Sequence, residues 1–268
     1  MSHSLPTIAI IGAGSMGGAI LSGLRRHDAD VRITTKSAAS AEGTEGAVST
    51  EVDPQANVKA VEGARVVLIG VKPLMVADVL REIAPALAAD AIVVSLAVGV
   101  TTAAMEAIVP GSVVRSMPNT PSLVGRGVTG ISAGSRATAD DLVIVQAVFE
   151  TVGEVLVVPE AQLDALSTIS GSGPAYVFLL IEQLTRTAVD LGFSEQEAAV
   201  MVQGTFRGAS ELLAASESGP AELRTKVTSP KGTTERAIAV LEQADLNGLF
   251  TRAAHAALAR AKELAEGA

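Results

Sequence analysis

Short apolar runs alternate with amphipathic stretches along roughly the first 160 residues. The strand candidates are runs of β-branched or aliphatic residues, and they cover residues 7–11, 31–35, 65–71, 91–97, 113–116, 129–133 and 154–158. Helical spacing of apolar positions follows over residues 16–25 and 74–87. Because fully apolar strands that alternate with helices are typical of buried parallel sheets, this half predicts a parallel sheet covered on both faces.

After Pro159 the pattern changes to helices, with almost no strand signal. Glycine and proline breaks leave room for five helices of about 10 to 20 residues. Residues 175–191 and 198–215 are apolar around much of the helix circumference, so they need cover from more than one side, and we expect a partner subunit. We therefore predict an α/β fold with an N-terminal Rossmann dinucleotide-binding domain, residues 1–160, and a C-terminal all-helical dimerisation domain, residues 161–268.

Composition excludes several classes of function. The 268 residues carry a net charge of -9, and the pI is near 4.9, which argues against nucleic-acid or anionic-membrane partners. The chain has no cysteine, and its three histidines have no ligand spacing, so we expect no metal site. Its longest apolar runs are about ten residues, against the roughly 20 that span a bilayer, and we expect a cytoplasmic protein.

A glycine-rich turn follows the first strand candidate. Gly12 permits a tight strand-to-helix turn, Gly14 lets the backbone approach a pyrophosphate, and Gly17 allows close helix packing. Ser15 and Met16 complete the turn, where helix N-terminal amides bind phosphate charge. In this α/β context the turn predicts a dinucleotide site, although a glycine-rich turn without a ligand is the alternative.

The end of the second strand favours one cofactor over the other. An NAD-binding unit usually places an acidic residue there for the ribose hydroxyls. This chain has Thr35, Lys36 and Ser37 instead, which suit a 2′-phosphate. We therefore expect NADP(H), with NAD(H) possible; the alternative is that Lys36 is only a solvated strand end.

A second motif lies near the C-terminus. Ser229 and Pro230 end a turn, and Gly232, Thr233 and Thr234 open a helix. Free helix amides, two hydroxyls and Lys231 would form a pocket for a small carboxylate. An ordinary helix cap explains the same residues equally well on physical grounds alone.

This motif resembles the signature of the Δ1-pyrroline-5-carboxylate reductase family. The matching residues are Pro220, Leu223, Val227-Thr228-Ser229-Pro230-Lys231-Gly232-Thr233-Thr234, Ala237, Ile238, Leu241 and Glu242. Other family segments occur in order at residues 71–73, 117–121 and 164–178, so the resemblance spans nearly the whole chain. The chain departs from the family at Lys231, where glycine is common.

The resemblance implies an oxidoreductase acting on a CH–NH bond. It would reduce (S)-1-pyrroline-5-carboxylate to L-proline, the last step of proline biosynthesis, with a hydride from the nicotinamide. Gly232, Thr233 and Thr234 would hold the substrate carboxylate, Lys231 would add attraction, and Thr234 would also hydrogen-bond the ring nitrogen. Glu217 would stabilise the cationic iminium, unless it is a surface glutamate.

The resemblance also implies the cofactor contacts. The 2′-phosphate would contact Thr35, Lys36, Ser37 and Asn57. The adenosine would contact Val71, Lys72 and Pro73. The nicotinamide would contact Ala97, Gly99 and Asn119. Lys72 has an alternative role as a strand-end cation, and Asn119 as a turn residue. Tyr176, the only tyrosine, is expected to pack between helices rather than to donate a proton.

Two other functions fit parts of the pattern. A β-hydroxyacid dehydrogenase would carry a catalytic lysine one helical turn after the Gly171–Pro174 stretch, but no lysine follows it before Lys226. A non-enzymatic NADP sensor would not need the 229–234 loop. The resemblance further implies a homodimer that assembles into a larger homo-oligomer, a decamer made of five dimers.

Overall fold

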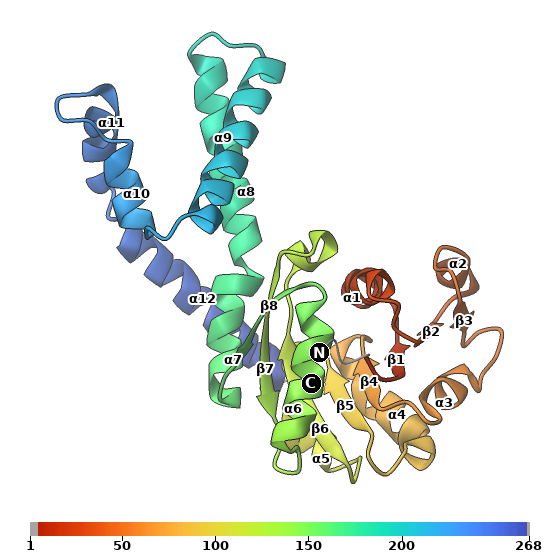
Figure 1. Ribbon diagram of the computed structural model, residues 1–268. Helices are drawn as coiled ribbons and strands as arrows, with labels where there is room; N and C mark the ends of the chain where they lie inside the picture. Colours follow the sequence, from red (N-terminus) through yellow and green to blue (C-terminus); the bar gives the residue numbers. More distant parts are fainter. Residues whose placement is uncertain (1–4, 267–268) are drawn as a thin grey trace. The chain divides into compact units, whose positions relative to one another are not determined.

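The computed structural model describes residues 5–266 and contains two compact units (Figure 1). One unit comprises the chain up to Ser172 together with the stretch from Ala256, and the other comprises Gly173–His255. The division into domains 1–160 and 161–268 stays a prediction. Within the described residues, no helix is both long enough and apolar enough to cross a membrane.

A single eight-stranded sheet forms the first unit, in the order β3-β2-β1-β4-β5-β6-β7-β8. The strands are β1 Ile8–Ile11, β2 Val31–Thr35, β3 Ala47–Ser49, β4 Val66–Ile69, β5 Ile92–Ser95, β6 Ser112–Met117, β7 Gly127–Ala133 and β8 Gly153–Val157. The pairs from β3 through β6 are parallel, as predicted.

The prediction of a wholly parallel sheet is wrong at β7, which runs antiparallel to β6. A parallel crossover needs about a dozen residues or more. The chain turns from Met117 to Gly127 through a short 3-10 helix, η2 Thr120–Val124, which is too short for a crossover. β8 then pairs parallel with β7.

Helices cover both faces of the sheet. They are α1 Ser15–Arg26, α2 Ala38–Glu42, α3 Ala56–Val61, α4 Pro73–Ile83, the 3-10 turn η1 Ala84–Ala86, α5 Thr102–Glu106, α6 Ala139–Glu150, α7 Glu160–Leu166 and the π-helical turn η3 Ser167–Gly171. Alternate residues of β1 enter different cores, because side chains alternate along a strand. Ile10 packs with residues of α1 and α6, whereas Ile11 packs with residues of α3, α4 and α5.

The second unit is helical, as the sequence predicts. Its helices are α8 Gly173–Asp190, α9 Glu195–Ala215, α10 Pro220–Lys226, α11 Thr233–Glu242 and the first part of α12 Leu246–Glu266. α8 and α9 lie side by side (Figure 1). Of α9, only Ala198 and Val202 are buried, and none of the residues of α8 are. Large apolar side chains are exposed instead, so these helices lack cover within one chain.

Candidate active site

The glycine turn joins β1 to α1 at the carboxyl edge of the sheet. Gly12 has a φ of 86°, and a Cβ there would lie 2.8 Å from Val71 Cγ1. A Cβ on Gly17 would lie 2.9 Å from the Gly12 carbonyl oxygen, so both positions need glycine. Gly14 caps α1 without a side-chain hydrogen bond, which leaves the amides of the first helical turn available for phosphate.

A cavity of about 710 Å³ opens beside this turn. Its walls come from the turn, the ends of β2 and β4, and α4, and its volume is within the range of cofactor pockets. The predicted cofactor residues that line it are Gly12, Gly14, Thr35, Lys36, Asn57, Val71 and Lys72. The predicted residues outside its lining are Ser15, Met16, Gly17, Ser37, Pro73, Ala97, Gly99 and Asn119.

The end of β2 presents a cation without an acidic partner. Lys36 lines the cavity, is exposed, and forms no ion pair within residues 5–266. Thr35 Oγ1 donates to the Ser37 carbonyl oxygen at 3.1 Å, and Ser37 Oγ caps α2 by accepting from the Ser40 amide at 3.2 Å. Ser37 is therefore committed to α2, while the Lys36 ammonium is available to a ligand.

Asn57 is a buried wall of the same cavity rather than a free polar group. Thr34 Oγ1 donates to Asn57 Oδ1 at 2.7 Å, and Asn57 Nδ2 donates to Glu82 Oε2 at 3.1 Å. These bonds tie α3 to β2 and α4. Asn57 thus fixes the shape of the pocket.

Beyond the cavity, the connection from β5 to α5 carries the residues predicted at the nicotinamide. The Ala97 amide donates to Ser95 Oγ at 3.1 Å, and Gly99 has a φ of 79°. Pro73 and Gly99 line a smaller cavity of about 160 Å³ between α4 and α5. Pro73 and Gly99 therefore lie near each other, outside the main pocket.

Both the nitrogen and the oxygen of the buried Asn119 side-chain amide form hydrogen bonds with distant backbone groups. Its Nδ2 donates to the Ser170 carbonyl oxygen at 2.9 Å, and its Oδ1 accepts from the Val128 amide at 2.8 Å. The side chain joins the end of β6 to the start of β7 and to the π-helical turn. Such turns are frequent at functional sites.

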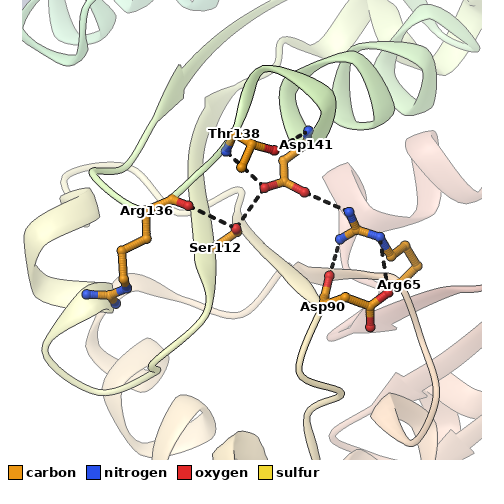
Figure 2. Close-up of polar contacts among 6 residues, drawn as sticks. All are labelled: Arg65, Asp90, Ser112, Arg136, Thr138 and Asp141. Carbon is orange, nitrogen blue, oxygen red and sulfur yellow. Dashed lines mark hydrogen bonds and ion pairs between the residues drawn. The ribbon is translucent and has the colours of Figure 1, made fainter.

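The opposite edge of the sheet holds a separate polar cluster, shown in Figure 2. Arg65 Nη2 donates to Asp141 Oδ1 at 2.7 Å, and Ser112 Oγ donates to Asp141 Oδ2 at 2.8 Å. Asp141 also completes a capping box with Thr138 at the start of α6. Burial alone would raise the pKa of Asp141, but these hydrogen bonds outweigh it and lower the pKa to about 2. Since the cluster lies at the amino ends of β4 and β6, its role is structural.

The predicted substrate loop lies in the helical unit. A Cβ on Gly232 would lie 2.9 Å from the Ser229 carbonyl oxygen, so the loop requires glycine there. Gly232 caps α11 without a side-chain hydrogen bond. Thr233 and Thr234 are exposed, and their hydroxyls have no hydrogen-bond partner in the described part of the chain. The helix start therefore offers free amides and free hydroxyls together.

Lys231, the departure from the family pattern, takes the left-handed conformation with a φ of 63°. A lysine pays a steric cost there that glycine does not. Its amide donates to Glu235 Oε2 at 3.0 Å, a hydrogen bond that was not predicted from the sequence. The lysine thus keeps the backbone form that a glycine would adopt freely.

Two further residues of predicted function lie in the helical unit. Glu217 is exposed between α9 and α10, and it forms no ion pair among the described residues. Tyr176 of α8 packs against Phe250 of α12, with ring centroids 6.2 Å apart. The prediction that Tyr176 packs between helices is confirmed.

Sequence reasoning missed the buried arginine of β6. Arg115 is 3% exposed and pairs with Glu160 and Asp164 of α7. Its one signal was an arginine inside a strand candidate, directly after Val113 and Val114, because a buried arginine requires acidic partners. The identity of those partners depends on the fold.

Comparisons with known proteins agree with this architecture. The family described as pyrroline-5-carboxylate reductase dimerisation matches residues 160–264, and that described as coenzyme F420-dependent NADP oxidoreductase matches residues 7–99. The pyrroline-5-carboxylate reductase of Pseudomonas aeruginosa is 39% identical over 98% of this chain and 98% of its own length. That of Corynebacterium melassecola is 38% identical over 97% and 99%.

Solved structures are similar over the same extent. A pyrroline-5-carboxylate reductase from Coxiella burnetii has a TM-score of 0.90 and 36% identity, and the match covers 97% of this chain and 99% of that one. The pyrroline carboxylate reductase of Plasmodium falciparum, solved with NADP bound, has a TM-score of 0.81 and 25% identity over 97% and 98%.

Proposed function

Because the chain belongs to the pyrroline-5-carboxylate reductase family, whose members catalyse the last step of proline biosynthesis, we propose how its own residues perform that reaction. The enzyme is an NAD(P)H-dependent oxidoreductase that converts (S)-1-pyrroline-5-carboxylate to L-proline. The proposal concerns the preferred cofactor, the substrate contacts and the assembly.

NADPH is the preferred donor. The glycine turn beside Val71 lets a pyrophosphate approach the backbone closely, and Lys36 lines the cavity next to this turn. The Lys36 ammonium attracts the additional charge of a 2′-phosphate, and no acidic side chain ends β2 to accept ribose hydroxyls. When bound, the reduced nicotinamide supplies the hydride.

The substrate carboxylate binds at the start of α11. The observation that carries this assignment is the uncapped helix start, where the amides and the hydroxyls of Thr233 and Thr234 have no partner among the described residues. Lys231 adds positive charge. Thr234 Oγ1 hydrogen-bonds the ring nitrogen, and Glu217 stabilises the cationic iminium that accepts the hydride.

An iminium carbon is already electrophilic, so these residues mainly need to orient it. Holding a reactant in an attack geometry removes much of the entropic part of a barrier. This agrees with a substrate loop that presents amides and hydroxyls rather than a dedicated acid. The protein's part of the reaction is therefore positioning and charge stabilisation at a CH–NH bond.

The enzyme is a homo-oligomer through its dimerisation segment. The proposed assembly is a dimer that associates further into a decamer. Size-exclusion chromatography with light scattering measures this size directly.

The test of the activity is a turnover assay on the purified chain. NADPH and pyrroline-5-carboxylate are mixed with the enzyme, and the loss of NADPH absorbance and the formation of proline are followed together. We expect equal amounts of NADPH consumed and proline formed. No proline formation here, together with oxidation of a 3-hydroxy acid in a parallel assay supplied with NADP⁺, would contradict the assignment. Cofactor binding without turnover in either assay would indicate a sensor.

A further inference from the structure

Arg115 is a buried cation at the cofactor edge of the sheet. Its guanidinium donates to Asp164 Oδ1, and its Nη1 lies 3.6 Å from Glu160 Oε1. Arg115 is in register with Ser95 of β5, which is level with the last residues of β4 and β1. The ion pairs therefore lie at the edge where parallel sheets bind their ligands.

Glu160 extends this network to the start of α5. Its Oε1 accepts from the Thr102 amide at 2.8 Å, and its Oε2 accepts from Thr102 Oγ1 at 2.6 Å. One carboxylate therefore fixes the N-terminus of α5 and also contacts the guanidinium of β6. Thr102 is itself buried.

The segment between β5 and α5 is thereby held at both ends. At its beginning, the Ala97 amide donates to Ser95 Oγ, and Ser116 Oγ donates to the Ser95 carbonyl oxygen at 2.8 Å. At its end, Glu160 binds Thr102. Between these points lie the residues that we assign to the nicotinamide.

Stability is a poor explanation for this network. Arg115 Nε is buried and has no hydrogen-bond partner in the described part of the chain. Arg115 is buried, whereas the side chains of Glu160 and Asp164 are 28% and 23% exposed. Desolvation of the buried cation therefore offsets much of the ion-pair energy, and its unsatisfied donor adds a cost. A second link, from Asn119 to the Ser170 carbonyl oxygen, joins the same strand to the turn that follows α7.

We propose that Arg115, Glu160, Asp164 and Thr102 form a positioning network for the nicotinamide end of the cofactor. Through Thr102, the network anchors the C-terminal end of the 96–101 segment to Glu160 of α7, the first helix of the stretch that matches the dimerisation family. This inference rests on the proposed function, because it takes the Ala97 and Gly99 segment as the nicotinamide side. Its members act through that segment and touch neither hydride nor substrate.

The test uses the variant Glu160→Gln and compares the binding of a ligand that has the nicotinamide with that of a ligand that lacks it. Equilibrium binding is measured by calorimetry with NADP⁺ and with 2′,5′-ADP, which has the phosphorylated adenosine but no nicotinamide. We expect NADP⁺ to bind about threefold to tenfold more weakly, since the loss of one net hydrogen bond changes an equilibrium constant by about that factor. Binding of 2′,5′-ADP stays at the wild-type value, and KM for NADPH rises.

Asp141→Asn is the matched control. Like Glu160, Asp141 pairs with an arginine (Arg65) and binds the first turn of a helix. It lies, however, at the opposite edge of the sheet. It should lower thermal stability and leave the binding of both ligands unchanged. Equal effects of the two substitutions on NADP⁺ would overturn the inference, because the network would then be structural only.

Thr102→Val is the second variant, in case Glu160→Gln does not fold. It removes the hydroxyl bond to Glu160 without changing any charge, and it should produce a smaller change in the same direction. Unchanged NADP⁺ binding in Thr102→Val and Glu160→Gln, or equal weakening of 2′,5′-ADP, contradicts the proposal. Failure of the proposed function itself is distinguishable, because the wild-type chain would then form no proline.

Discussion

At the residue scale, Thr234 carries the most specific chemical assignment. Thr234→Ala removes the hydroxyl assigned to the ring nitrogen, so kcat/KM for pyrroline-5-carboxylate should fall. We expect the loss of transition-state stabilisation to be about 2 to 3 kcal/mol. NADPH binding should not change, because Thr234 is not among the residues that line the cofactor cavity. Steady-state kinetics with both substrates measure the effect.

Thr234→Ser serves as the control, because it keeps the hydroxyl and loses only a methyl group. Activity near the wild-type value is expected for it. If Thr234→Ala is as active as the wild type, the assignment of the ring nitrogen to Thr234 is wrong.

Lys36 is the residue that tests cofactor preference. Lys36→Ala removes an exposed ammonium that has no acidic partner among residues 5–266, so folding should be unaffected. A charge-assisted contact contributes about 1.5 to 3 kcal/mol, and we expect NADPH binding to weaken by up to that amount while NADH binding changes little. Fluorescence titration with each cofactor gives the two affinities, and equal losses would refute a 2′-phosphate contact.

Residue identities were predictable where backbone geometry demands them, and less so where side chains meet across the fold. Gly12 and Gly232 follow from local turns, and the structure shows that a Cβ has no room at either. The cofactor contacts of Asn57 and Asn119 stay predictions, whereas the bonds of their amides to Thr34, Glu82 and distant backbone were not predicted. Such long-range partners are not encoded in any local pattern.

At the element scale, the α6 cap predicts how stability depends on pH. The folded-state pKa of Asp141 is lowered from 3.8 to about 2, so its contribution is present above pH 4 and is lost as the pH falls through 2. The shift corresponds to about 2 kcal/mol of unfolding free energy. Asp141→Asn should therefore be less stable than the wild type at pH 7, and the difference should shrink between pH 4 and pH 2.

Denaturant unfolding of both proteins across that pH range measures the difference. Asp140→Asn is the control, because Asp140 occupies the same helix turn but is exposed. It should change stability by no more than a few tenths of a kcal/mol. A constant gap between Asp141→Asn and the wild type down to pH 2 would contradict the role assigned to this carboxylate.

Strands and helices were predictable as elements, but the direction of one strand was not. Apolar runs locate β1, β2, β4 and β5 to within a few residues, because burial on both faces leaves a clear local pattern. The direction of β7 depends on the length of its connection to β6. β3 was missed because only three residues pair at the sheet edge, where Val48 is exposed.

At the scale of the whole molecule, the helical unit leaves large apolar side chains uncovered by its own helices. Phe178 of α8 is 67% exposed, and Leu191 and Val200 are 75% and 71% exposed. Exposed apolar surface of this kind marks an interaction site, and the dimerisation match covers all three residues. A second copy of the chain is the cover that this family match indicates.

Phe178→Glu is therefore expected to break the assembly. In an isolated chain the substitution costs little, since the side chain is already in solvent, but in an apolar interface it buries an unpaired charge. Light scattering coupled to size-exclusion chromatography should show monomers at concentrations where the wild type is oligomeric. Val143→Glu on α6 is the matched control, because Val143 is 66% exposed but lies outside the dimerisation match. If Val143→Glu dissociates the protein and Phe178→Glu does not, the interface lies on the sheet-containing unit instead.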